Sequence, residues 1–569
     1  MSVFQEILLV RNTLIIVLVP LAALPILFID GSKDTMIFSF SCLSFALTIE
    51  RWNLHRRIAL GCLLLTGSSP KWLTLGFMVP TWFLSMWVNN TSATAMMIPV
   101  ASAVLKQLAE LESAQASDKF GEDSNNTHQK ELAQMADDSE DDQQGESSSP
   151  HLDKKRPDSG VRHSEHDAEA MQDAISISGS SEFRRLCKAL SLCVCYSATI
   201  GGTASLTGTG TNLVMQGQAD EVFATYHLDS GVNFLTWIIC CLPMSFTCLV
   251  IAWIWLVFHF FGLREVLRFS CGDKTATEAT RSIVRKELHK LGPITFAEKV
   301  IIGHFILMLT LWLTMKMPGG FGWGQIFQPG FVSNSTTGVI VIASLFVFPS
   351  NTKNKATGSP EPLMTWQYLQ DNYPWQIWML LGGAFAMASS CQKSGLSAWF
   401  GARLTAVASL EPWLMLLLLS LSISFMTEIT SNVATVSILA PIMAQLAISL
   451  QVNPLYLLYA TALTCSMAFM LPVATAPNAI VFATGYIKIK DMVKAGLILN
   501  VLCVVTMCIF ISTWFTFILG LDVLPPEMLL GEAEVNLTQT NISSSARAPK
   551  QSVAATENST DLFLTNLPI

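Results

Sequence analysis

The feature that most constrains this chain is a series of apolar runs, each about as long as a bilayer is thick. A transmembrane helix needs about 20 consecutive apolar residues. Only 13% of the 569 residues are charged, against about 25% in soluble globular proteins. The pattern therefore predicts an all-α polytopic membrane protein. The expected spans cover residues 8–29, 36–50, 185–207, 233–261, 298–316, 335–349, 374–391, 455–485 and 490–521.

Two further apolar stretches, 72–109 and 412–450, are nearly twice the length of a span and carry a polar break at the middle. The breaks are NNTS at Asn89–Ser92 and TSN at Thr430–Asn432. Each stretch is either two full spans with a buried turn or a re-entrant hairpin. Backbone that leaves a helix at membrane depth must be buried in protein or line a wet cavity. The breaks therefore predict buried, functional positions.

Charged and glycosylatable segments indicate the orientation. The basic run 51–57 (RWNLHRR), predicted to be an interfacial helix, and the basic loop 262–297 are expected in the cytoplasm. Tail 524–569 carries glycosylation sequons at Asn536, Asn541 and Asn558, which are accessible only on the outside. If both long stretches are hairpins, these assignments agree: the N-terminus is cytoplasmic and the C-terminus extracellular.

An internal repeat organises the rest of the chain. Segment 83–100 aligns with 425–442 without a gap, matching Asn90 with Asn432, and 202–214 aligns with 468–480. Each half therefore has a hairpin followed by a broken span, which predicts an inverted repeat. The first half is expected to comprise region 1–109 with the first hairpin, an acidic disordered cytoplasmic loop at 110–183, and a broken span with the span that follows it at 184–261. The second repeat is expected at 298–523 and contains hairpin 412–450 and broken span 455–485.

Broken helices explain why neutral polar residues stand in these segments. A break exposes unpaired N–H groups at one half-helix and unpaired carbonyls at another, which suit an anion and a small cation respectively. Polar residues also join helices in membranes, and for one isolated hydroxyl this packing role is the better interpretation. For Asn90, Asn432 and both breaks together, a transport site is favoured. Glu428 is either a proton or ion ligand or a helix-pairing or gating residue.

Other functional classes have little support. The sequence contains no HExxH, GxSxG or Walker motif, and its nine histidines lie mainly in loops. An enzyme, a cofactor and a nucleic-acid partner are therefore not expected.

The motifs resemble those of the divalent-anion sodium symporters of solute carrier family 13. The similar segments are ERWNLHRRIAL (50–60), SMWVNNTSATAMM (85–97), SATIGGTASLTGTGTNLV (197–214), KLGPITFAE (290–298), LLGGAFAMA (380–388), TEITSNVAT (427–435) and FMLPVATAPNAIVF (469–482). The resemblance implies a homodimeric elevator-type transporter of the plasma membrane that couples several sodium ions to each divalent anion.

The resemblance also implies ligands, residue by residue. Sodium site one would comprise Ser85, Asn89, Asn90 and a carbonyl near Gly208. Sodium site two would comprise Thr427, Thr430, Asn432 and a carbonyl near Ala474. The substrate would meet Asn90, Thr91, Thr209, Asn432, Val433 and Thr475.

The chain departs from the family pattern in three places. Asn89 replaces a serine, Val433 replaces a threonine as in several carboxylate carriers, and about two scaffold spans are absent between Ile29 and span 36–50. Such a loss leaves the predicted ligands in place but affects the scaffold and the dimer contact. A splice form or an incomplete gene model would have the same sequence.

Three short motifs favour di- and tricarboxylates such as succinate and citrate over sulfate. They are SNVAT (431–435), GGTAS (201–205) and VATAPNA (473–479). A sulfate cotransporter of the same family, a channel or uniporter on the same scaffold, and a truncated transport-inactive form remain as alternatives.

Overall fold

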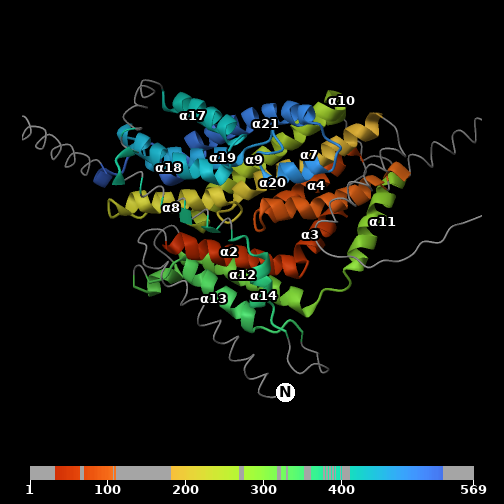
Figure 1. Ribbon diagram of the computed structural model, residues 1–569, viewed down its shortest axis with the longest axis horizontal. Coiled ribbons are helices and arrows are strands. Elements are labelled where there is room, and N and C mark those ends of the chain that lie inside the picture. Colours follow the sequence, from red (N-terminus) through yellow and green to blue (C-terminus); the bar gives the residue numbers. More distant parts are fainter. Residues whose placement is uncertain are drawn as a thin grey trace, which may run out of the picture. The chain divides into compact units, whose positions relative to one another are not determined.

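The structure is a computed structural model that describes residues 33–64, 69–106, 108–110, 181–267, 274–316, 322–328, 331–351, 361–375 and 411–528, with scattered residues between 378 and 399. The chain divides into Met1–Val523 and Leu524–Ile569, and the elements below belong to the first unit. Figure 1 shows that they are helices. Within the described residues, the β-structure is a single bridge between Pro349 and Pro362.

The described part confirms an all-α, multi-pass membrane protein. Six of its helices are long and apolar enough to cross a membrane: Asn90–Glu110, Ser181–Ala204, Phe234–Phe261, Phe296–Met315, Asn432–Ser449 and Ile489–Leu519. Among the shorter predicted spans, 36–50 corresponds to α2 (Lys33–Arg51) and 335–349 to α13 (Asn334–Val347). The predicted span 8–29, most of the acidic loop and the three sequons lie outside the described residues, and span 374–391 does so in part. The predicted basic loop 262–297 contains helices α10 (Leu263–Leu267) and α11 (Lys274–Lys290).

Both polar breaks are tight turns between two helices. In the first, α4 (Pro70–Ser85) is followed by the helix Asn90–Glu110. In the second, α17 (Pro412–Thr427) is followed by α18 (Asn432–Ser449). A proline opens each first arm, where its missing N–H costs no helical hydrogen bond. Each first arm has 16 residues, or about 24 Å of helix, which is shorter than the roughly 30 Å hydrocarbon core.

The two predicted broken spans are also interrupted as expected. α7 (Ser181–Ala204) and α8 (Gly210–Ala224) flank one unwound segment, and α19 (Pro454–Ser466) and α20 (Ala476–Ala483) flank the other. The same packing recurs in both halves. α4 packs on α7 and on α9 (Phe234–Phe261), while α17 packs on α19 and on α21 (Ile489–Phe510). α8 contacts both α18 and α19, so the halves meet at the breaks.

A second group of helices, α2, α12 (Phe296–Met315) and α13, packs together. It contacts the first hairpin through aromatic side chains. Trp87, in the first turn, lies edge-on to Phe305 of α12 with ring centroids 4.9 Å apart. Its ring also lies 6.2 Å from that of Phe234 on α9. These rings hold the first turn against its neighbours.

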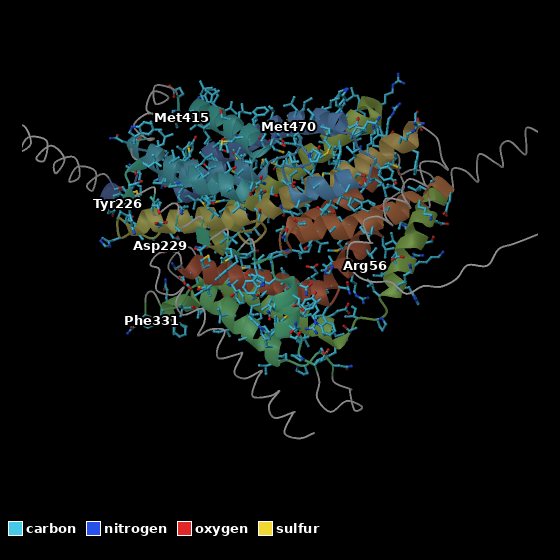
Figure 2. The ribbon with its side chains drawn as sticks, viewed as in Figure 1. Arg56, Tyr226, Asp229, Phe331, Met415 and Met470 are labelled. Carbon is cyan, nitrogen blue, oxygen red and sulfur yellow. The ribbon has the colours of Figure 1, made fainter. Side chains whose placement is uncertain are left out.

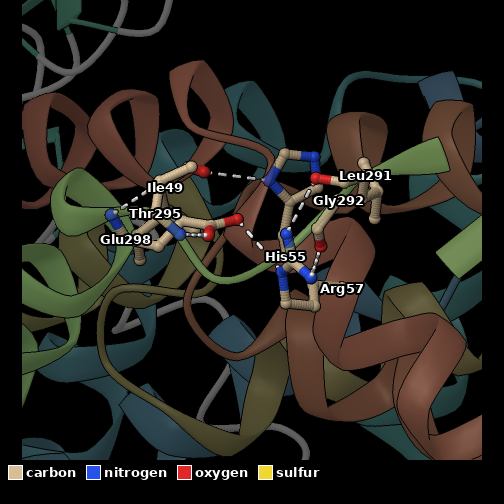
Figure 3. A network of polar contacts seen from close by, with 7 residues as sticks. All are labelled: Ile49, His55, Arg57, Leu291, Gly292, Thr295 and Glu298. Atoms are coloured by element: carbon tan, nitrogen blue, oxygen red, sulfur yellow. Dashed lines mark hydrogen bonds and ion pairs between the residues drawn. The ribbon is translucent and has the colours of Figure 1, made fainter. Parts of the chain in front are cut away.

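Figure 3 shows the polar network that fixes helix α3 (Leu54–Leu63). Arg57 donates to the carbonyls of Leu291 and Gly292 at 3.1 and 2.8 Å, and to the carboxylate of Glu298 at 3.1 Å. Glu298 in turn caps α12 by accepting from the backbone N–H of Thr295 at 2.6 Å. Burial lowers the pKa of His55, and its ring Nδ1 lies 3.0 Å from the carbonyl of Ile49. α3 is therefore tied at once to the end of α2 and to the start of α12.

Two adjacent arginines allow a matched test of this network. We expect Arg57→Gln to destabilise the protein by about 3 kcal/mol, because it leaves the carboxylate of Glu298, only 4% exposed, without its cation. Arg56 pairs with Glu287 at a similar distance, 2.9 Å, but is 40% exposed, so Arg56→Gln should cost less than about 1 kcal/mol. Thermal stability of the purified variants in detergent measures both effects. Equal losses would contradict the assigned role of Arg57.

Candidate functional site

Three oxygen atoms converge at the first hairpin. Ser85 ends α4, and its Oγ lies 2.6 Å from Oδ1 of Asn90, which begins the next helix. The same Oγ lies 2.6 Å from the carbonyl oxygen of Ala198 on α7. A serine hydroxyl has one proton and can donate to only one of these acceptors. The cluster is thus one hydrogen short, a property that suits an oxygen-binding cation.

The second hairpin repeats the arrangement. Oγ1 of Thr427, the last residue of α17, lies 2.8 Å from Oδ1 of Asn432, the first residue of α18. It also lies 3.0 Å from the carbonyl oxygen of Cys465 on α19. We call Ser85, Asn90 and the Ala198 carbonyl the first oxygen cluster, and Thr427, Asn432 and the Cys465 carbonyl the second.

An asparagine organises each unwound segment. The Nδ2 of Asn212 donates to the carbonyls of Gly202 and Ser205 at 3.0 and 2.8 Å. At the aligned positions of the second half, Asn478 donates to Ala468 and Leu471 at 3.1 and 3.0 Å. Carbonyls at a helix end lack intrahelical partners, and these fully buried amides supply them. The alignment of the repeats paired Asn212 with Asn478, but without the structure it did not show this role.

The two breaks contact each other directly. The Thr211 hydroxyl on α8 lies 2.6 Å from that of Ser466 at the end of α19. The Tyr196 hydroxyl on α7 donates to the carbonyl of Phe469 in the second unwound segment at 3.1 Å. Each cluster includes a backbone carbonyl of α7 or α19. The contacts above therefore link the two broken spans that supply these carbonyls.

A glycine makes room for the first cluster. A Cβ atom added at Gly202 would lie 2.3 Å from Oδ1 of Asn90, and one at Gly208 would lie 2.5 Å from the carbonyl oxygen of Gly202. Both distances are far below van der Waals contact. The glycine-rich sequence of the break therefore reflects close packing of the Asn90 amide against α7.

The remaining predicted ligands lie on the same turns and breaks, but the side chains of several of them form hydrogen bonds with residues nearby in the sequence. Oδ1 of Asn89 accepts from the N–H of Thr91 at 2.8 Å. The Thr430 hydroxyl lies 2.6 Å from that of Thr435. Thr475 accepts from the N–H of Asn478 at 3.3 Å. Thr209 is the N-terminal cap of α8 without such a side-chain bond, Val433 lies in the first turn of α18, and Gly208 and Ala474 belong to the two unwound segments.

Glu428 follows Thr427 in the second turn and is 1% exposed. Its carboxylate accepts hydrogen bonds from the backbone of the second unwound segment and from Asn500 on α21. This geometry matches the helix-pairing role considered for Glu428. Among the described residues no three His, Cys, Asp or Glu side chains gather as a metal centre. The two oxygen clusters consist of hydroxyl, amide and backbone carbonyl oxygens, all of them neutral.

Several known proteins are similar to this chain. The Na(+)/dicarboxylate cotransporter 3 of Mus musculus is 39% identical over 511 residues, covering 86% of this chain and 81% of that protein. Solute carrier family 13 member 1 of Rattus norvegicus is 38% identical, with 85% and 82% covered. The Na(+)/citrate cotransporter of Rattus norvegicus is 37% identical, with 89% and 88% covered.

A solved structure of the Neisseria gonorrhoeae efflux pump MtrF aligns over 88% of this chain and 86% of the MtrF chain at 13% identity. Its TM-score of 0.49 is too low to support a conclusion.

The family evidence is in the sequence. Residues 4–521 match the family described as the sodium:sulfate symporter transmembrane region. Because that match covers most of the chain and similar proteins carry the family name, the chain belongs to the sodium:sulfate symporter family and, within it, to solute carrier family 13.

Proposed function

We propose that this protein is a sodium-coupled symporter that imports di- and tricarboxylates such as succinate and citrate. The observation that carries the proposal is the pair of oxygen clusters, in which one hydroxyl faces two acceptor oxygens at each hairpin. A sodium ion beside each cluster would supply the positive charge that the oxygens lack. Relatives of similar identity are named as sodium/dicarboxylate and sodium/citrate cotransporters.

Coupling follows from the neutrality of the ligands. A fixed arginine would bind the anion whether or not sodium is present, whereas Asn90 and Asn432 bring no net charge of their own. Each begins a helix, so free N–H groups face the same region as the ions. Anion binding then depends on bound sodium, which is what symport requires.

The proposed ligand sets are those implied by the family resemblance. Sodium site one would use Ser85, Asn89, Asn90 and Gly208, and sodium site two Thr427, Thr430, Asn432 and Ala474, while the anion would meet Asn90, Thr91, Thr209, Asn432, Val433 and Thr475. The carbonyl oxygens of Ala198 and Cys465 lie 2.6 and 3.0 Å from the hydroxyls of Ser85 and Thr427, which supports adding them to the proposed sets.

Overall sequence identity does not indicate which anion is transported, because the named relatives are all 37–39% identical to the chain. The second tip favours carboxylates. Val433 makes its first helical turn partly apolar, and by the family resemblance the motif SNVAT (431–435) favours the carboxylate branch over the sulfate branch. Sulfate is the second candidate, supported by the description of the matching family.

The finer architecture belongs to the same proposal. The repeated packing of hairpin on broken span supports an inverted repeat and an elevator mechanism, in which the two hairpins move as one unit against α2, α12 and α13. We further propose a homodimer in the plasma membrane, with a cytoplasmic N-terminus, an extracellular glycosylated tail and about two scaffold spans fewer than its relatives. Comparison of the transcript with genomic sequence would show whether exons encoding those spans exist.

Uptake of radiolabelled succinate, citrate and sulfate by cells that express the protein tests the function, with sodium present or replaced by choline. We expect succinate or citrate uptake at least tenfold above that of untransfected cells in sodium and none above it in choline. Uptake that persists in choline would indicate a channel or uniporter. No uptake despite normal surface labelling would indicate a transport-inactive form.

A further inference from the structure

Glu428 makes an unusual set of contacts for a carboxylate within a membrane hairpin. Its Oε1 accepts from the backbone N–H of Phe469 at 2.8 Å, from that of Met470 at 3.0 Å and from Nδ2 of Asn500 at 2.8 Å. Its Oε2 accepts from the N–H groups of Met470 and Leu471 at 3.1 and 3.0 Å. Met470 is labelled in Figure 2. Three consecutive amides of the second unwound segment thus converge on one carboxylate.

These contacts favour the charged form of the carboxyl group. Within the described residues, the hydrogen-bond partners of Glu428 are donors, and a protonated carboxyl would need an acceptor for its own hydrogen. Asn500 closes the network, since its Oδ1 accepts from the same Phe469 N–H at 3.2 Å while its Nδ2 donates to Glu428. These donors offset part of the cost of burying a charge, so the arrangement favours Glu428 as a carboxylate anion.

The first hairpin has no corresponding charge. The alignment of the repeats places Met86 opposite Glu428. There the connection to the unwound segment uses the backbone carbonyl of Met86, which accepts from the Ser205 hydroxyl and, at 3.5 Å, from that of Thr207. Both turns are thus tied to their broken spans, but only the second tie carries a full negative charge.

The charge lies on the residue that follows Thr427 of the second oxygen cluster in the chain. Glu428 directly follows Thr427, whose hydroxyl belongs to that cluster, and it binds the unwound segment that begins two residues after Cys465. Holding that segment against α17 orients the Cys465 carbonyl toward Thr427 before any ion arrives. Side chains of consecutive residues lie within about 10 Å of each other, and at an effective dielectric of about 20 an anion at that distance favours a cation by about an order of magnitude in affinity.

We propose that Glu428 is a positioning residue that preforms the second oxygen cluster and gives it the higher sodium affinity, so that the two sodium sites are unequal. The proposal rests on the sodium coupling proposed above. It also follows that the amides of Phe469, Met470 and Leu471 are unavailable to the anionic substrate, because Glu428 already occupies them.

The dependence of succinate uptake on sodium concentration tests this inference. For Glu428→Gln, we expect the half-saturating sodium concentration to rise about tenfold, with little change in maximal uptake at saturating sodium. Glu428→Asp keeps the charge and should recover most of the loss. Asn500→Ala removes one partner of the carboxylate but no charge, and its shift should stay below about threefold. Wild-type sodium dependence in Glu428→Gln, or an equal shift in Asn500→Ala, would overturn the proposal.

A binding measurement separates this inference from the proposed function. Sodium, added to purified protein in place of choline, should raise the thermal stability of the wild type at a lower concentration than that of Glu428→Gln. A wild type that shows this stabilisation but no uptake would refute the symport and leave the inference standing. If Glu428→Gln does not fold, two other variants test the same inference. Thr427→Ala should abolish the tighter sodium-binding step, and Ser85→Ala should abolish the weaker one. Loss of the weaker step in Thr427→Ala and of the tighter step in Ser85→Ala would overturn the proposal.

Discussion

Replacement of Asn432 by alanine is expected to abolish sodium-dependent succinate uptake. The substitution removes an oxygen that lies 2.8 Å from the Thr427 hydroxyl and, with it, the amide that the proposed site uses for both ion and anion. Loss of outer-shell partners of metal sites typically costs 10–100-fold, and loss of a direct ligand should cost at least about 100-fold in sodium-dependent uptake. Asn90→Ala should have a comparable effect at the first hairpin.

Asn453→Ala is the matched control for this experiment. Asn453 is also buried and accepts from the N–H of Leu455 at 3.0 Å as the N-terminal cap of α19. Its loss should cost about 1 kcal/mol of stability but leave sodium dependence unchanged. Surface biotinylation of each variant corrects uptake for expression. Sodium-dependent uptake that survives in Asn432→Ala would remove this residue from the proposed site.

Gly202→Ala is expected to reduce uptake at least tenfold although it adds only one methyl group. The new Cβ would lie 2.3 Å from Oδ1 of Asn90, so the amide must leave the position in which it contacts Ser85. The first oxygen cluster would then lose its asparagine. The effect should appear as a higher half-saturating sodium concentration as well as a lower maximal rate.

Gly303→Ala provides the comparison. Gly303 lies in α12, and an added Cβ there meets nothing within 4 Å. Alanine is a better helix former than glycine by about 1 kcal/mol, so this variant should be as stable as the wild type or more so, with unchanged uptake. Similar losses of uptake in both variants would show that the Gly202 effect is a general cost of substitution in a helix, not displacement of Asn90.

Two of the candidate site residues, Asn90 and Asn432, could be predicted because they stand in polar breaks of long apolar stretches. Ser85 and Thr427 were implied by the family resemblance, and the structure brings each of these hydroxyls within 2.8 Å of its asparagine. The nearest carbonyls could not be predicted in the same way. The resemblance implied carbonyls near Gly208 and Ala474, and the contacts to the hydroxyls come from Ala198 and Cys465. Every residue has a carbonyl, so residue types do not indicate which one a neighbouring element will present.

Asn212, Asn478 and Asn500 illustrate the same limit. Each is an asparagine in an apolar segment, and that pattern fits a helix contact as well as an ion ligand. Their amides bind unwound backbone in two cases and the Glu428 carboxylate in the third. A matching pair of asparagines in an internal repeat was the available signal for the first two.

The sequence by itself determined the elements of this protein: apolar helices, two hairpins with polar tips and two interrupted spans. These are local properties, because in a bilayer each segment must satisfy its own backbone hydrogen bonds. Only the tertiary structure decided which oxygens share a cluster and that Glu428 binds the amides of Phe469, Met470 and Leu471. Such contacts join residues far apart in the chain, and they depend on how whole helices pack against one another.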